Sequence, residues 1–115
     1  MNTTELIQEI QAVSQSQRKF RNEKSPIEAR FNEIEDKLGI NYWQLTSKDR
    51  AYDIVAARHI MMYLMRKQDS MTLKAIGKVF NRDHSSIIHA VTRIQDAQAA
   101  REFRLIPKLK LFGIC

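Results

Sequence analysis

The sequence has few of the residues that build crosslinked or β-rich proteins. Its one cysteine, Cys115, is the last of 115 residues, which excludes an internal disulfide framework and a zinc site made of cysteines. A terminal cysteine also lacks the downstream residues of a prenylation signal. With 3 glycines and 2 prolines, the chain lacks the turn residues that an all-β fold needs. We therefore expect an all-α fold.

Long apolar runs are missing as well. No stretch approaches the roughly 18 apolar residues of a membrane-spanning helix. Glu5 and Glu9 interrupt the region where a secretory signal would have its apolar core. We expect no membrane partner and a cytoplasmic location.

Positive charge is in excess, and it is unevenly distributed. The formal net charge is +6 and the sequence pI is about 9.7. Residues 1–40 hold six Lys/Arg and seven Asp/Glu, whereas residues 41–115 hold thirteen and six. The basic excess therefore belongs to the second part of the chain, where it favours a polyanionic partner.

The same part contains the pattern of a helix-turn-helix, in TLKAIGKVFNRDHSSIIHA (residues 72–90). Apolar residues recur at helical spacing on both sides of a short polar break. In the break, Asn81 can adopt a left-handed backbone conformation and Asp83 is a good N-cap. The residues of the two apolar faces are Leu73, Ile76 and Phe80, then Ile87, Ala90, Val91 and Ile94.

The first turn of the second helix carries side chains that suit a DNA major groove. His84, Ser85 and Ser86 are small or polar groups that can reach base edges. Arg82, just before the helix, and the positive end of the helix dipole favour a phosphate nearby. The alternative is structural: Asp83 would be only a cap, and the next three residues a solvated helix start.

The remaining segments predict further helices. Residues 3–20 follow a heptad-like pattern, which indicates a homodimer contact, docking on the domain or partial disorder.

Helices are expected over residues 27–38, with Gly39 as the C-cap, and over residues 49–67. Between them, residues 40–48 form an aromatic segment whose apolar groups we expect to pack under the next element. Ser70 or Thr72 should cap the first helix of the helix-turn-helix. Residues 105–114 predict either a closing helix or a partner-binding tail.

Four motifs in order resemble one known family. SKDR (47–50), AARHIMMYL (56–64), IGKVF (76–80) and RDHSSIIHA (82–90) together resemble the C-terminal DNA-binding domain of the bacterial replication initiator DnaA. The resemblance covers about 70 residues, from Ile27 to Asp96. It implies an all-α helix-turn-helix domain of the Trp-repressor-like type over residues 26–97. An N-terminal helix and linker (1–25) and a C-terminal helix or tail (98–115) would flank it.

The resemblance also implies roles for individual residues on double-stranded DNA. Arg50 matches an arginine that enters the minor groove, and Asp83, His84, Ser85 and Ser86 match base-reading and nearby phosphate-contacting positions. Arg58, Arg66 and Arg82 match positions at or near backbone contacts. From the residues alone, His89 is expected to be an internal packing residue.

Three departures from the family pattern stand out. Asn81 alone occupies the turn where the family usually has two glycines, and Ser85 and Ser86 replace the usual pair of threonines. The third departure is that the sequence contains no GxxxxGK[ST] phosphate loop, so we expect no ATP-driven helicase loading by this chain alone.

Three classes of function follow from these patterns. The favoured one is sequence-specific binding of DnaA-box-like DNA in the nucleoid, as a regulator or replication accessory. The alternative is an adaptor that uses a degenerate DnaA-like domain to bind replication or transcription proteins. A nuclease is disfavoured because His84 and His89 lie about 500° apart around a helix, on different faces. We expect no enzyme, cofactor, metal or small-molecule substrate.

Overall fold

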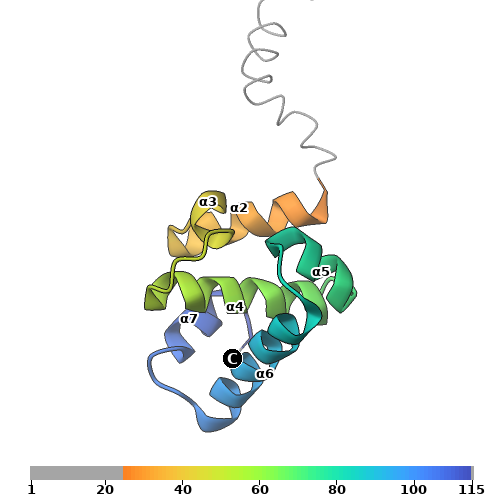
Figure 1. The fold of residues 1–115 in the computed structure, drawn as a ribbon. Helices are drawn as coiled ribbons and strands as arrows, with labels where there is room; N and C mark the ends of the chain where they lie inside the picture. Colours follow the sequence, from red (N-terminus) through yellow and green to blue (C-terminus); the bar gives the residue numbers. More distant parts are fainter. Residues whose placement is uncertain (1–24, 115) are drawn as a thin grey trace, which may run out of the picture. The chain divides into compact units, whose positions relative to one another are not determined.

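The computed structural model describes residues 25–114, and every regular element in this range is an α-helix. This confirms the predicted all-α class. None of the helices described is long and apolar enough to cross a bilayer. The expected helix over residues 3–20, and the dimer contact it would make, lie outside the described residues. The helices are α2 (Pro26–Leu38), α3 (Tyr42–Leu45), α4 (Tyr52–Lys67), α5 (Leu73–Phe80), α6 (His84–Ala100) and α7 (Ile106–Leu111) (Figure 1).

The chain divides into two compact units, residues 1–30 and residues 31–115. The division between the units falls inside α2. At the other end, α6 continues to Ala100. The bounds expected from the sequence stay a prediction. The core and the candidate site described below belong to the second unit.

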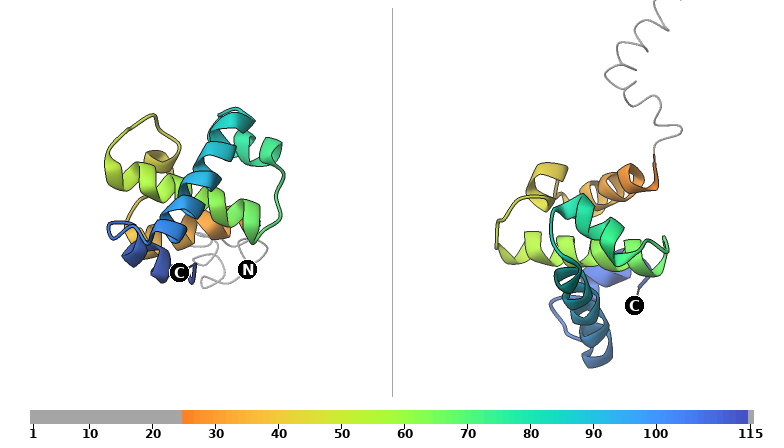
Figure 2. Two further views of the ribbon diagram at one scale, coloured as in Figure 1. Left: turned by 90° about the horizontal axis from the view of Figure 1, so that it is seen from below. Right: turned by 45° about the vertical axis from the view of Figure 1, so that its right-hand side comes forward.

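The core of the second unit is organised around α4. This helix packs against α3, α5 and α6, and α6 crosses it in both views of Figure 2. The crossing is lined by side chains with no exposed surface, among them Ile60 and Leu64 of α4 and Ile87 and Ile94 of α6. Burying such side chains stabilises a fold by about 1.5 to 3 kcal/mol each, so this contact holds α6 in place.

The segment before α4 contains a short helix that sequence reasoning did not predict. Asn41 begins α3 with a capping box, in which its side chain accepts from the Gln44 amide at 2.9 Å and the Gln44 side chain accepts from the Asn41 amide at 2.9 Å. Leu45 is buried as expected, but Tyr42 and Trp43 are 46% and 76% exposed. The expectation that these aromatic groups pack under the next element was wrong for Trp43, because one helical turn cannot turn all its side chains inward.

The C-terminal segment closes the core, the first of the two alternatives for this stretch. Leu109 of α7 is fully buried, and Phe112 is 8% exposed. Lys108 lies 3.4 Å from the Asp53 carboxylate, and the guanidinium of Arg104 stacks 3.7 Å from the centre of the Tyr52 ring. These contacts attach the segment to the first turn of α4, the helix around which the core is organised.

Candidate nucleic-acid interface

The turn between α5 and α6 has the conformation that its residues predict. Asn81 ends α5 in the left-handed region, with φ 55° and ψ 50°. The Arg82 amide then donates to the Gly77 carbonyl at 2.9 Å. A Cβ atom on Gly77 would lie 2.5 Å from the Arg82 carbonyl oxygen, which is closer than real Cβ contacts. The absence of a side chain at Gly77 therefore lets the turn pass directly over α5.

The first turn of α6 is exposed and well capped. Asp83 is the N-cap, and its side chain accepts from the Ser86 amide at 3.2 Å. The side chains of Asp83, His84, Ser85 and Ser86 are all exposed, whereas Ile87 is fully buried. The structure thus brings together the four residues that sequence reasoning assigned to base reading and nearby phosphates, and it leaves them open to a partner.

Arg58 has a different place from the one predicted. Its side chain is 5% exposed, so it has little surface with which to contact a DNA phosphate. Its Nε donates to the Leu45 carbonyl at 2.8 Å, and one terminal nitrogen lies 3.1 Å from the Ser47 carbonyl, 3.2 Å from that of Asp49 and 3.4 Å from that of Gln44. Burial, and then the charge of Arg82, lower the pKa of Arg58, while Asp49 raises it. Arg58 therefore holds the loop of residues 46–51.

The loop of residues 46–51 carries Arg50, and it is tied to the turn of the helix-turn-helix. A terminal nitrogen of Arg82 donates to the Ser47 carbonyl at 3.0 Å, across 35 residues of sequence. Arg50 follows three residues later and is exposed. The loop that bears Arg50 is therefore bonded to the turn that precedes α6.

Arg66 is exposed near the other end of α4. One of its terminal nitrogens donates to the Met71 carbonyl at 2.9 Å, in the connection that precedes α5. The side chain is therefore fastened to the start of the helix-turn-helix, at the opposite end of α4 from Arg50.

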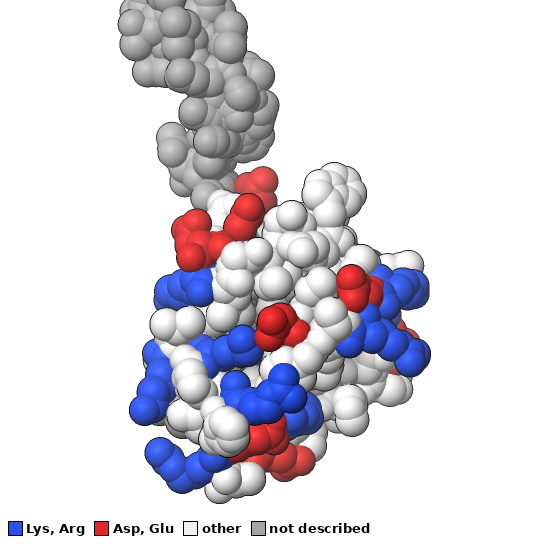
Figure 3. Space-filling model, turned by 90° about the vertical axis from the view of Figure 1, so that its left-hand side faces the viewer, with Lys and Arg blue, Asp and Glu red and all other residues white. Residues whose placement is uncertain are grey.

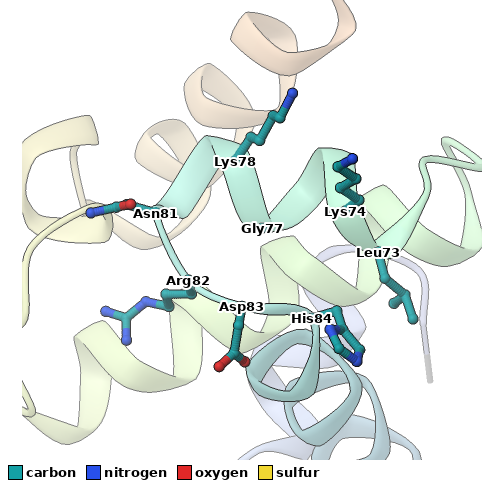
Figure 4. Close-up of a pocket in the computed structure, with 8 residues that line it drawn as sticks. All are labelled: Leu73, Lys74, Gly77, Lys78, Asn81, Arg82, Asp83 and His84. Atoms are coloured by element: carbon teal, nitrogen blue, oxygen red, sulfur yellow. The ribbon is translucent and has the colours of Figure 1, made fainter.

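Two lysines of α5 belong to the same surface and were not singled out from the sequence. A groove of about 720 Å³ runs between α5 and the start of α6. Lys74 and Lys78 extend from α5 on one side of it, and Arg82, Asp83 and His84 extend from the turn and α6 on the other (Figure 4). Their spacing of four residues, opposite the buried face of α5, is the signal that could have identified them.

A second hollow, the α4–α6 cavity, lies beside the first turn of α6 and has a volume of about 380 Å³. His89 is exposed here, so the expectation of an internal packing role was wrong. Its ring stands edge-on to that of His59, with 6.3 Å between the ring centres. The polar residues of the lining are Arg58, His59, Arg82, Ser85, Ser86 and His89.

The electrostatics of this cavity are dominated by positive charge. Burial lowers the pKa of His59 to about 4, with smaller contributions in the same direction from His89, Arg58, Arg93 and Arg82. A cationic imidazole would be surrounded by other cations, so the neutral form is favoured. An anion placed in the cavity would instead favour the cationic form of the imidazole.

The charged residues of one face are shown in Figure 3. Lys and Arg gather there in two groups, separated by mostly uncharged side chains with a few carboxylates. Within residues 25–114 we find no cluster of three or more His, Cys, Asp or Glu placed to hold a metal ion. The chemistry that the described surface offers is hydrogen bonding and attraction of anions.

Several known proteins are similar to this chain. It is 36% identical over 75 residues to the chromosomal replication initiator protein DnaA of Streptococcus agalactiae serotype Ia, which is 64% of this chain and 17% of the relative. The initiator DnaA of Oleidesulfovibrio alaskensis is 36% identical over 69 residues (60% and 15%). That of Pseudothermotoga lettingae is 26% identical over 80 residues (70% and 18%). The chain spans less than a fifth of the length of these relatives.

No solved structure matches the chain. The family model for the bacterial dnaA protein helix-turn-helix matches residues 30–94, which is more than half of the sequence and includes α3, α4, α5 and most of α6. That family is a DNA-binding domain and not a catalytic one. The chain belongs to the family of bacterial DnaA helix-turn-helix domains.

Proposed function

We propose that this chain binds a specific double-stranded DNA sequence similar to a DnaA box, and that it acts as a regulator or replication accessory. The observation that carries the proposal is the exposed row from Asp83 to Ser86 at the start of α6, beside the loop that bears Arg50. The start of α6 enters the major groove, where its short polar side chains read base edges. Arg50 enters the adjacent minor groove.

Contacts to phosphates position the domain on the duplex. Arg82 and Ser86 flank the base-reading residues, and Arg66 stands at the far end of α4. The first helix of a helix-turn-helix crosses the DNA backbone, so Lys74 and Lys78 of α5 contact the strand beside the groove. With about four or five phosphates neutralised, the log of the binding constant should fall with the log of salt concentration with a slope near −4 to −5.

The replacement of the family's two threonines affects which sequence is preferred. Ser85 and Ser86 retain hydroxyl groups that can bond to bases or phosphates, but they lack the methyl groups that could contact a thymine methyl. We expect a preferred sequence related to a DnaA box but altered at positions that face these residues.

Selection of bound sequences from a random duplex library tests the proposal directly. We expect one enriched short motif, bound more tightly than random duplex at equal salt. His84→Ala or Ser85→Ala should weaken binding to that motif by about 1 to 3 kcal/mol and blur the choice of sequence.

The matched control is Arg66→Ala, a change to a phosphate-contacting position. It should weaken binding to all sequences alike and reduce the salt slope by about one. Equal losses on the motif and on random duplex for both kinds of variant would contradict the assignment of roles. The absence of any salt-sensitive binding at low ionic strength would favour the protein-adaptor alternative.

A further inference from the structure

The α4–α6 cavity is built to receive an anion. Six polar residues line it, all of them hydrogen-bond donors or able to become donors, and Met62 is the one apolar residue of the lining. No carboxylate is among them. A lining of this kind favours a ligand with several acceptor oxygens.

Arg82 provides an independent sign that a partner is missing. Its Nε is buried and has no hydrogen-bond partner among the described residues. One terminal nitrogen is already held by the Ser47 carbonyl at 3.0 Å, which fixes the guanidinium in position. Buried polar atoms without partners are rare in folded proteins, and an arginine donates readily to phosphate oxygens. Arg82 lines the cavity, and its bond to Ser47 fixes the guanidinium there.

The two histidines distinguish this cavity from a plain arginine site. His59 comes from α4 and His89 from α6, so the pair bridges the two helices that form the cavity. Other charged groups near them are Arg58 on α4, Arg93 on α6 and Arg82 in the turn. No carboxylate is among the groups that shift the pKa of His59; Glu102 pairs with Arg93 at 2.6 Å, and Asp49 acts on Arg58. The histidines thus face cations without a facing acid.

We propose that the α4–α6 cavity is a proton-coupled site for one phosphate group, in which His59 takes up a proton as the phosphate binds. The inference rests on the proposed function, because a phosphate of the bound DNA strand is the expected occupant. Inorganic phosphate carries the same chemistry and is the second possible source. Arg82 and the hydroxyls of Ser85 and Ser86 hold the phosphate oxygens, and the protonated His59 balances its charge.

The direction of the pH effect follows from charge. Without an occupant, burial and the neighbouring cations keep His59 neutral at pH 7, since they lower its pKa to about 4. A bound phosphate stabilises the imidazolium of His59, so it raises the pKa of His59 and a proton is taken up. By linkage, affinity must then rise as pH falls, by at most about tenfold per pH unit for one proton.

The three histidines of the sequence allow a direct measurement. NMR titration of the full chain between pH 5 and 8 would follow the imidazole signals of His59, His84 and His89, first alone, then with inorganic phosphate, then with duplex DNA. We expect the pKa of His59 to rise in the presence of duplex. A rise with inorganic phosphate as well would show that the site accepts any phosphate group. Unchanged values under both conditions would overturn the inference.

Binding measurements give the second readout. For the natural chain, affinity for duplex should increase about tenfold from pH 7.5 to pH 5.5, with the fold monitored by circular dichroism. His59→Gln combined with His89→Asn should remove this increase. Thr92→Asn is the matched control, because Thr92 is exposed on α6 outside the cavity and its replacement should leave both the affinity and the pH slope in place.

Failure of the inference and failure of the proposed function can be told apart. Two outcomes would overturn the inference alone. One is sequence-selective binding with no pH slope, and the other is a pH slope that the double variant retains. Absence of sequence-selective binding, with His59 and His89 still responding to inorganic phosphate, would overturn the proposed function and leave the phosphate site standing.

Discussion

The turn between α5 and α6 and the loop of residues 46–51 both carry side chains of the proposed interface, but they are held in different ways. In the turn, the important contacts join neighbours: Asp83 caps the Ser86 amide, and the Arg82 amide bonds to Gly77. In the loop, the carbonyls of residues 44, 45, 47 and 49 are bonded by Arg58, between nine and fourteen residues away.

This difference shows how one recognition surface can depend on two kinds of support. The turn is specified by residues adjacent in sequence, so its conformation needs little beyond the packing of α5 and α6. Two arginines hold the loop: the buried guanidinium of Arg58, and Arg82, which donates to the Ser47 carbonyl. A change at Arg58 should therefore disturb the loop, whereas a change in the turn should act locally.

The largest expected effect is that of Arg58→Met. The methionine fills much of the same space but leaves buried carbonyls without a donor, so we expect the free energy of unfolding to fall by about 3 kcal/mol. Urea denaturation measures this loss. Arg66→Met is the matched control on the same helix: its side chain is exposed and donates to one carbonyl, so a loss within about 0.5 kcal/mol is expected. Similar losses for the two variants would mean that the buried guanidinium of Arg58 does not hold the loop.

A smaller effect is expected for Gly77→Ala, which tests the turn. Alanine favours a helix over glycine by about 1 kcal/mol, but the added Cβ would meet the Arg82 carbonyl oxygen at 2.5 Å. Because that oxygen belongs to the backbone, the turn must move, and we expect a net loss of about 2 kcal/mol. Thermal unfolding would measure it, with exposed Lys78→Ala as the control. A more stable Gly77→Ala protein would mean that the turn does not pass closely over α5.

The smallest effect is expected for Asp83→Ala, which removes the cap of α6. Loss of an N-cap acceptor costs about 1 kcal/mol. Asp83→Asn should restore most of the stability, because the amide oxygen can still accept from the Ser86 amide. Chemical denaturation of the two variants checks this order. If both lost the same stability, the carboxylate charge at the start of the helix would matter more than the hydrogen bond.

Local patterns were sufficient to predict much of this protein. Apolar spacing predicted α4, α5 and α6, although α4 begins at Tyr52 and not at residue 49. Asn81 and Asp83 were correctly predicted as the left-handed residue and the cap, because each acts through atoms within a few residues of itself. The exposed row from Asp83 to Ser86 followed from the same helical periodicity.

The burial of individual side chains could not be predicted from local sequence patterns. Arg58 and Arg66 sit on one helix in similar local sequence, and only the packing of α3 against α4 buries the first and leaves the second exposed. His89 was expected inside, but the crossing of α4 and α6 leaves it at the rim of a cavity, facing His59.

The sequence by itself determined the long helices, the caps, the turn and the family, because these depend on contacts between residues close along the chain and on motifs in a set order. Only the tertiary structure decided which arginine supports the loop, which histidines share a cavity, and that the loop bearing Arg50 is bonded to the turn before α6. These properties depend on which helix faces cross, and a side chain's surroundings then come from residues far away in the sequence.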